Sequence, residues 1–180
     1  MSMIDDIIDG IIKAEGGFVD HPDDRGGATC WGITEAVARA AGYTGAMRDL
    51  PRQTAVDIYR RRYVDQPGFG AIVPVSMAIA AELVDTGVNM GTVVAGRFLQ
   101  RSLNALNRQG ADWPDVAVDG VIGPATVSAL RAAILKRGRP GELVILKALN
   151  ALQGARYIEL AEGRAANESF AFGWFQGRVA

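Results

Sequence analysis

The sequence predicts a mainly α-helical fold with one small β element near residues 16–33. Apolar residues recur at helical spacing through most of the 180 residues, Gly- and Pro-rich turns separate these stretches, and strand patterns are scarce. With 49% hydrophobic and 22% charged residues, the composition is that of an ordinary folded protein. The length suffices for one compact domain, or for one domain with a small annex.

The first helix is expected over the isoleucine-rich N-terminus. Its apolar side chains recur three and four residues apart: Ile4, Ile7, Ile8, Ile11 and Ile12. Ser2 and Asp5, three residues apart, resemble a capping box that opens this helix. Between residues 16 and 32 the chain is rich in Gly, Pro and Asp, which predicts an irregular loop or a short hairpin.

Further helices follow, separated by turn-rich linkers at 107–123 and around Gly138. Their expected ranges are 34–42, 51–66, 75–90, 93–106, 124–135 and 141–160. Thr34 is expected to cap the first of these, and Ala55, Ile58 and Tyr59 to face inward from the second. Arg60, Arg61 and Arg62 are consecutive, and we interpret them as a solvated helix face rather than a groove for an acidic ligand.

Composition excludes several classes of function. A net charge of −1 leaves no excess of positive charge for a phosphate backbone, so nucleic acid is not an expected partner. Cys30 is the only cysteine and His21 the only histidine, which argues against disulfides, Cys-rich zinc sites and Ser or Cys triads. The acidic N-terminus does not resemble a secretory signal, and no apolar run is long enough for a membrane span.

Glu15 is the carboxylate of greatest chemical interest. It follows Ile12 by three residues and Ile11 by four, which places it at the edge of the stripe that faces the core. Apolar surroundings and the negative end of the helix dipole would both favour its protonated form, as a general acid requires. The alternative is an exposed carboxylate at a helix end, and the spacing alone does not decide between them.

The segment from Glu15 to Thr34 closely resembles glycoside hydrolase family 108, a family of N-acetylmuramidases. The resemblance comprises Glu-Gly-Gly at 15–17, an Asp-rich turn, Gly26-Gly27, Thr29 and Gly-Ile-Thr at 32–34. A second resemblance, to the predicted peptidoglycan-binding segment that accompanies this family, lies in Asp85 to Gly91, Phe98-Leu99-Gln100, Val118 to Thr126 and Phe172-Gly173-Trp174. Together they imply a lysozyme-like helical hydrolase, with a catalytic region at 1–90 and a peptidoglycan-binding region at 91–180, packed into one compact unit.

The resemblance implies hydrolysis of the β-1,4 bond between N-acetylmuramic acid and N-acetylglucosamine, with Glu15 as the essential acid. Such glycosidases use a second carboxylate, for which Asp24 is the leading candidate and Asp20 and Asp23 are rivals. Thr29 is expected to position water.

Other residues are expected to contact the substrate or to pack. Gly26 and Gly27 permit a close approach to sugar, and Asp20, Asp85 and Asn89 are further candidates for binding. Trp31, with Phe18 and Tyr59, is either a stacking wall for sugar rings or part of the core. We interpret His21 as a loop residue and Cys30 as a small packed side chain.

Two other activities stay open: a lytic transglycosylase and a non-catalytic protein that binds the cell wall. We expect a monomer that binds a peptidoglycan glycan strand and needs no metal and no cofactor. The absence of a signal predicts synthesis in the bacterial cytoplasm and action on the wall in the periplasm. A holin or another export route would then be the functional partner, as for a phage endolysin.

Overall fold

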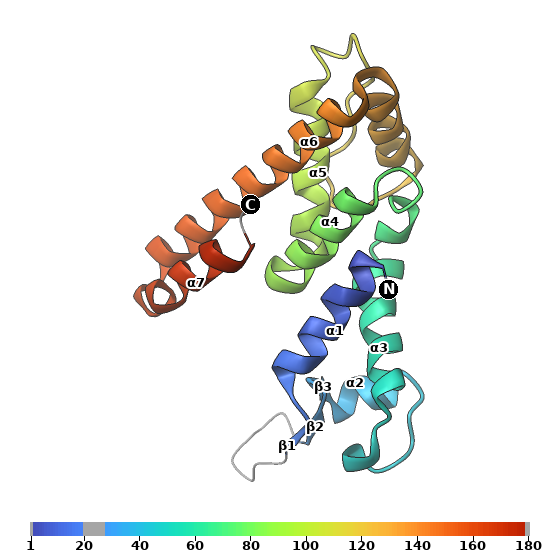
Figure 1. The fold of residues 1–180 in the computed structure, drawn as a ribbon, viewed down its shortest axis with the longest axis vertical. Coiled ribbons are helices and arrows are strands. Elements are labelled where there is room, and N and C mark those ends of the chain that lie inside the picture. The colour runs from blue at the N-terminus through green and yellow to red at the C-terminus, as the bar shows by residue number, and fades with distance from the viewer. Residues whose placement is uncertain (1, 20–27, 179–180) are drawn as a thin grey trace. The chain divides into compact units, whose positions relative to one another are not determined.

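A computed structural model describes residues 2–19 and 28–178, and it divides the chain into two compact units, Met1–Gln66 and Pro67–Ala180. Figure 1 shows helices throughout and a small antiparallel sheet in the first unit, so the predicted mainly α fold with a β element near residues 16–33 is confirmed. Residue 90, where the predicted catalytic region ends, is the last residue of a helix of the second unit.

Helix α1 (Met3–Glu15) opens the first unit, as the isoleucine spacing predicted. The capping box is confirmed: the Ser2 hydroxyl accepts a hydrogen bond from the Asp5 backbone N–H, and the Asp5 carboxylate accepts one from the Ser2 N–H. Ile4, Ile8 and Ile12 are buried along the face that packs on α3. Burying each side chain stabilises the unit by about 1.5–3 kcal/mol.

A three-stranded antiparallel sheet follows α1, in the order β1 (Phe18–Val19), β2 (Thr29–Cys30), β3 (Ile33–Thr34). Cys30 is paired with Phe18 on one side and with Ile33 on the other. Helix α2 (Glu35–Ala40) begins directly after β3. The predicted cap is confirmed, because the Thr34 hydroxyl accepts a hydrogen bond from the Val37 N–H.

Helix α3 (Arg52–Arg60) follows the short helix η1 (Met47–Asp49) and continues as a π-helical turn, η2 (Arg61–Asp65). The predicted inward residues Ala55, Ile58 and Tyr59 are buried. Two ion pairs join α3 to α1, between Arg60 and Asp5 and between Arg52 and Asp9. An apolar face flanked by ion pairs therefore holds the two long helices of this unit together.

The second unit begins with η3 (Phe69–Ala71), α4 (Met77–Met90) and α5 (Thr92–Leu106). Gly91, with φ 94°, makes the turn between α4 and α5, which pack against each other and against α6. Their buried side chains include Ile79, Leu83, Leu99 and Leu103. This extensive packing explains why α4 joins the second unit rather than the first.

Helix α6 (Pro124–Gly163) covers both helices predicted for its range, and Gly138 interrupts it with non-helical dihedral angles. The short helix η4 (Ala165–Asn167) and α7 (Glu168–Arg178) close the unit, and α7 was not predicted from the sequence. Within the described residues, no helix is both long and apolar enough to cross a membrane.

Candidate active site

Glu15 is the last residue of α1, where the chain turns toward the sheet. Gly16 follows with φ 76°, and its N–H donates to the Ile12 carbonyl at 3.3 Å, which closes the helix. Of the two alternatives for Glu15, the structure shows the exposed carboxylate at a helix end: the buried stripe of α1 ends at Ile12, and Glu15 is exposed. The carboxylate is therefore accessible to a ligand from solvent.

A two-residue turn joins β2 to β3 beside Glu15. Both of its residues have positive φ, 55° at Trp31 and 72° at Gly32, as tight hairpin turns of type I′ require. Such a conformation is costly for a bulky side chain, about 1–3 kcal/mol. Two hydrogen bonds hold Trp31 there: its indole N–H donates to the Leu50 carbonyl at 3.0 Å, and its own carbonyl accepts from the Tyr59 hydroxyl at 3.1 Å.

Gly32 lies in close contact with the side chains of Glu15 and Tyr59. A Cβ at this position would lie 2.7 Å from Glu15 Cγ and 2.6 Å from the Tyr59 hydroxyl oxygen. Both distances are shorter than real Cβ contacts, so only glycine fits without displacing a neighbour. The strained turn at Trp31 thus places a residue without a side chain against the candidate acid.

Tyr59 links this contact to the π-helical turn. Burial raises its pKa to about 12, and the nearby Glu15 carboxylate adds to the effect, so the hydroxyl keeps its proton and remains a donor. The Tyr59 ring stacks with Tyr63, with centroids 6.0 Å apart. The Arg62 guanidinium lies over the Tyr63 ring at 5.4 Å. A continuous row of contacts therefore runs from Glu15 to Arg62.

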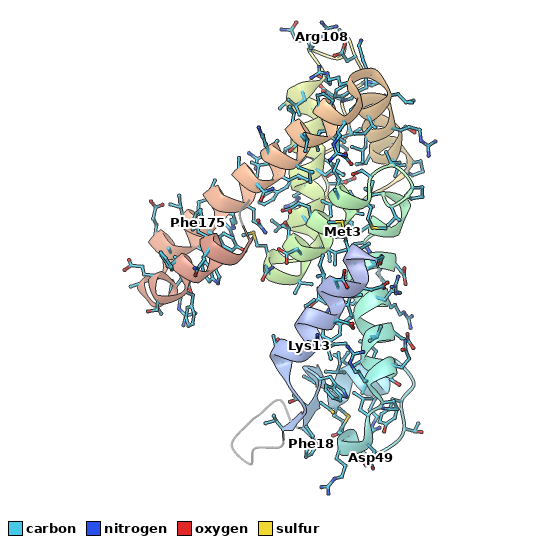
Figure 2. All side chains as sticks on the ribbon, in the orientation of Figure 1. Met3, Lys13, Phe18, Asp49, Arg108 and Phe175 are labelled. Carbon is cyan, nitrogen blue, oxygen red and sulfur yellow. The ribbon has the colours of Figure 1, made fainter. Side chains whose placement is uncertain are left out.

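The other site residues predicted in the first unit differ in where the structure places them. Asp20, Asp24, Gly26 and Gly27, with Asp23 and His21, lie outside the described residues. Thr29 is half-buried in β2, opposite Val19 and Thr34. Phe18 is exposed, and Arg48 of η1 lies over its ring at 5.6 Å; Figure 2 labels Phe18 among the side chains of the first unit. Cys30 is a buried, packed side chain as expected, and burial raises its pKa.

Asp85 and Asn89 lie one turn apart on α4, in the second unit. The Asn89 side-chain amide donates to the Asp85 backbone carbonyl at 2.7 Å and to its carboxylate at 3.4 Å. Sequence reasoning missed Glu82 on the same helix: burial, helped by the Asp85 charge, raises its pKa to about 7. The sequence could have indicated Glu82 through its spacing of three residues from Asp85, which places the two carboxylates side by side on the helix.

The segment from Val118 to Thr126 serves the packing of the second unit. Gln100, almost fully buried on α5, donates to the Asp119 carboxylate at 2.8 Å and to the Val121 carbonyl at 3.0 Å, and accepts from the Gly120 N–H at 2.7 Å. Gly120 packs directly against the α5 backbone at Gly96. The Asp-Gly turn is therefore held against α5 by Gln100.

Metal binding has no structural support in the part of the chain that the structure describes. No group of three or more His, Cys, Asp or Glu side chains comes together there in a way that could hold a metal ion.

Comparison with known proteins agrees with the two sequence resemblances. Residues 8–91 match the family model for glycosyl hydrolase 108, and residues 94–179 match the one for a predicted peptidoglycan domain. The first match thus extends beyond the first compact unit and includes α4. No curated protein matches the chain.

Among solved structures, the chain is similar to SagA of Brucella abortus. The two are 26% identical, with a TM-score of 0.60, over 95% of this chain and 86% of that one. Glu15, Gly32 and Tyr59 all lie within the residues matched by the glycosyl hydrolase model. Residues 8–91 therefore form a glycosyl hydrolase 108 domain, and a predicted peptidoglycan domain follows it at residues 94–179.

Proposed function

We propose that this glycosyl hydrolase is an N-acetylmuramidase, which cleaves the β-1,4 bond between N-acetylmuramic acid and N-acetylglucosamine, with Glu15 as the general acid. The observation that carries the proposal is the contact of Gly32 with Glu15, within the glycosyl hydrolase match. It positions a solvent-accessible carboxyl group at the end of a capped helix. A general acid must be positioned within hydrogen-bond reach of the glycosidic oxygen that it protonates.

The proposed reaction begins with proton transfer from the Glu15 carboxyl group to the glycosidic oxygen. The bond from the anomeric carbon to that oxygen breaks, the leaving sugar keeps the proton as a hydroxyl, and positive charge develops on the remaining ring. A bound glycan strand would cover Glu15 and exclude water from it.

Completion of the reaction requires a water molecule and a second carboxylate. We propose Asp24 for this role, with Asp20 and Asp23 as the alternatives, and Thr29 as a residue that positions the water. Water adds its oxygen to the anomeric carbon and leaves one proton on the carboxylate. The product then has a free reducing end on muramic acid.

The predicted peptidoglycan domain supports a wall polymer as the substrate. We propose that Asp85, Asn89 and Trp31 take part in binding the glycan strand, without a metal or cofactor. The biological role that we propose is lysis by a phage or prophage endolysin, made in the cytoplasm and released to the periplasm through a holin or another export route. The same chemistry would serve a chromosomal enzyme that loosens the wall for the release of proteins.

The deciding experiment is mass spectrometry of purified peptidoglycan after digestion by the wild type and by Glu15→Gln. Borohydride reduction marks free reducing ends. We expect reducible muramic acid ends from the wild type and none from Glu15→Gln. Glu35→Gln removes another exposed carboxylate of the same unit, which is paired with Arg39, and should leave digestion intact.

Other outcomes would contradict the proposal. Anhydro ends in place of reducible ends would identify a lytic transglycosylase. Binding of the wild type to peptidoglycan without release of soluble fragments would identify a wall-binding protein. Full activity of Glu15→Gln would remove Glu15 from the mechanism.

A further inference from the structure

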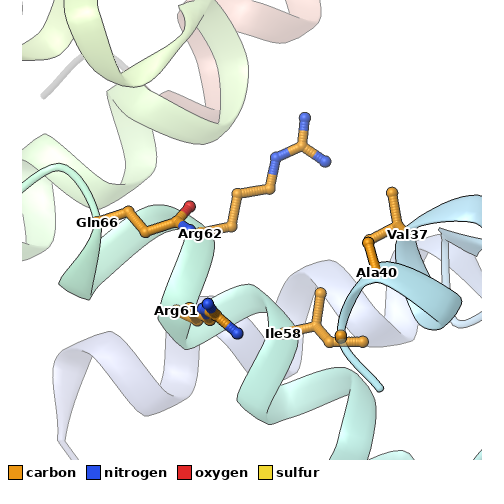
Figure 3. A pocket seen from close by; sticks show the side chains of 7 residues that line it. Val37, Ala40, Ile58, Arg61, Arg62 and Gln66 are labelled. Atoms are coloured by element: carbon orange, nitrogen blue, oxygen red, sulfur yellow. The ribbon is translucent and has the colours of Figure 1, made fainter. Parts of the chain in front are cut away.

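A hollow of about 280 Å³ lies in the first unit, between α2 and the end of α3. Seven residues line it: Val37, Ala40, Ala41, Ile58, Arg61, Arg62 and Gln66. Figure 3 shows Val37 and Ala40 of α2 on one side, and Ile58 of α3, Arg61 of the π-helical turn and Gln66 directly after that turn on the other. Its volume lies just below the range of about 300–1,000 Å³ for ligand sites, which suits a small group such as one or two residues of a peptide.

The lining combines an apolar surface with two cationic side chains. Val37, Ala40, Ala41 and Ile58 contribute only hydrocarbon, whereas Arg61 and Arg62 are exposed at the margin. This combination favours a ligand that has short aliphatic groups and a carboxylate close together. The planar guanidinium group binds a carboxylate through two parallel hydrogen bonds.

Arg61 and Arg62 differ from the neighbouring arginines in their pairing. Arg39, Arg52 and Arg60 each form an ion pair, with Glu35, Asp9 and Asp5 respectively. Within the described residues, neither Arg61 nor Arg62 is paired with a carboxylate. Two adjacent positive charges at an apolar hollow therefore remain available for an anionic ligand.

The π-helical turn and the helical spacing connect the hollow to the candidate active site. Arg62 lies four residues after Ile58 and three after Tyr59, so it is a neighbour of both on the helix surface. Its guanidinium contacts the Tyr63 ring, which stacks with Tyr59, and Tyr59 lies beside Gly32 and Glu15. Single π-helical turns of this kind often occur at functional sites.

We propose that this hollow binds the stem peptide of peptidoglycan, with Arg61 and Arg62 on a peptide carboxylate and alanine methyl groups against Val37 and Ile58. The inference rests on the proposed function, because the stem peptide is attached to the muramic acid whose bond is cleaved. The enzyme is then selective for glycan strands that carry peptides.

The first test compares intact peptidoglycan with the same material stripped of peptides by an amidase. We expect the wild type to release reducing ends from intact strands about tenfold faster, which corresponds to about 1.4 kcal/mol of binding to the peptide in the transition state. Arg61→Ala/Arg62→Ala should lose this preference, so that it releases reducing ends from intact and stripped strands at about the same rate. Arg61→Lys/Arg62→Lys should keep part of the preference for intact strands, because the positive charge remains although the planar guanidinium fork is lost.

Arg39→Ala is the matched control, since it removes an arginine of the same unit that is already paired with Glu35. It should keep the wild-type preference, and circular dichroism should show all variants folded. A double alanine variant that still prefers intact strands would overturn the inference. A wild type without preference would overturn it as well, whereas a wild type that cleaves neither substrate would refute the proposed function instead.

The second test is independent of catalysis. NMR signals of the arginine side-chain N–H groups are recorded with a soluble alanyl-glutamyl stem peptide, and separately with inorganic phosphate. We expect the peptide to shift the Arg61 and Arg62 signals and to leave those of Arg39 unchanged. Shifts caused by phosphate alone would overturn the inference in favour of a phosphate-bearing polymer, and the absence of any shift would overturn it outright.

Discussion

Gly32 and Glu15 are in direct contact across the β2–β3 turn, at a distance that leaves no room for a side chain at residue 32. A Cβ there would lie 2.7 Å from Glu15 Cγ and 2.9 Å from Glu15 Cβ. The turn that brings Gly32 to this place depends on positive φ at both Trp31 and Gly32. The position of the candidate acid is thus set by a backbone conformation rather than by a hydrogen bond to a described residue.

Gly32→Ala should displace the Glu15 side chain and reduce peptidoglycan cleavage about tenfold or more. Gly42→Ala is the matched control, because Gly42 also has positive φ, 92°, but a Cβ there meets nothing within 4 Å. Both variants should lose about 1–2 kcal/mol of stability from backbone strain. The measurement is the rate of reducing-end release, taken below the melting temperature of both variants. Equal losses of rate in Gly32→Ala and Gly42→Ala would contradict the role of the contact between Gly32 and Glu15.

Tyr59→Phe should destabilise the protein by about 0.5–1.5 kcal/mol, because it removes the hydroxyl that donates to the Trp31 carbonyl. The strained turn loses one of its two hydrogen bonds, so cleavage should fall together with stability. Tyr63→Phe keeps the stacked ring and removes a hydroxyl for which no hydrogen bond is found within the described residues. Urea unfolding compares the two, and a greater loss for Tyr63→Phe would refute this explanation.

Gly96→Ala should destabilise the second unit by about 3 kcal/mol, since its Cβ would overlap the backbone carbonyl group of Gly120. Gly10→Ala places the same methyl group in the middle of α1, where nothing lies within 4 Å. The higher helix propensity of alanine should there stabilise the protein by about 1 kcal/mol. Opposite shifts in melting temperature are therefore expected, and shifts of the same sign would contradict the close packing of α5 on the Asp-Gly turn.

Glu82→Gln should change how stability depends on pH. The pKa of Glu82 is raised from 4.5 to about 7 in the folded protein, so the folded state binds more protons than the unfolded state between these values. Stability of the wild type is consequently lost as pH rises from about 4.5 through about 7, by on the order of 2 kcal/mol after allowance for partial exposure. Glu82→Gln stays neutral and should lack this loss.

The measurement is urea unfolding at about pH 5 and about pH 8. Glu162→Gln, at an exposed position of α6, should behave as the wild type. An identical pH dependence for Glu82→Gln and the wild type would show that Glu82 is not the group responsible.

Local features were predictable from the sequence because they depend on residues close together in the chain. Isoleucine spacing predicted α1, and side-chain caps at Ser2 and Thr34 predicted where α1 and α2 begin. The Gly-rich hairpin region and the two family resemblances likewise follow from the order of the residues alone. Helix α7 was missed because no buried apolar stripe marks it: its large apolar residues Phe170 and Phe172 are exposed.

Contacts between distant residues were decided only by the tertiary structure. Helical spacing placed Glu15 at the edge of the core, yet α1 ends there and leaves it exposed, because a helical pattern does not say where burial stops. The sequence shows three consecutive arginines, but only packing of α3 on α1 pairs Arg60 with Asp5 and leaves Arg61 and Arg62 at the hollow. Periodicity and caps reflect interactions within a few residues, whereas the site arises from segments that meet only when their apolar faces are buried together.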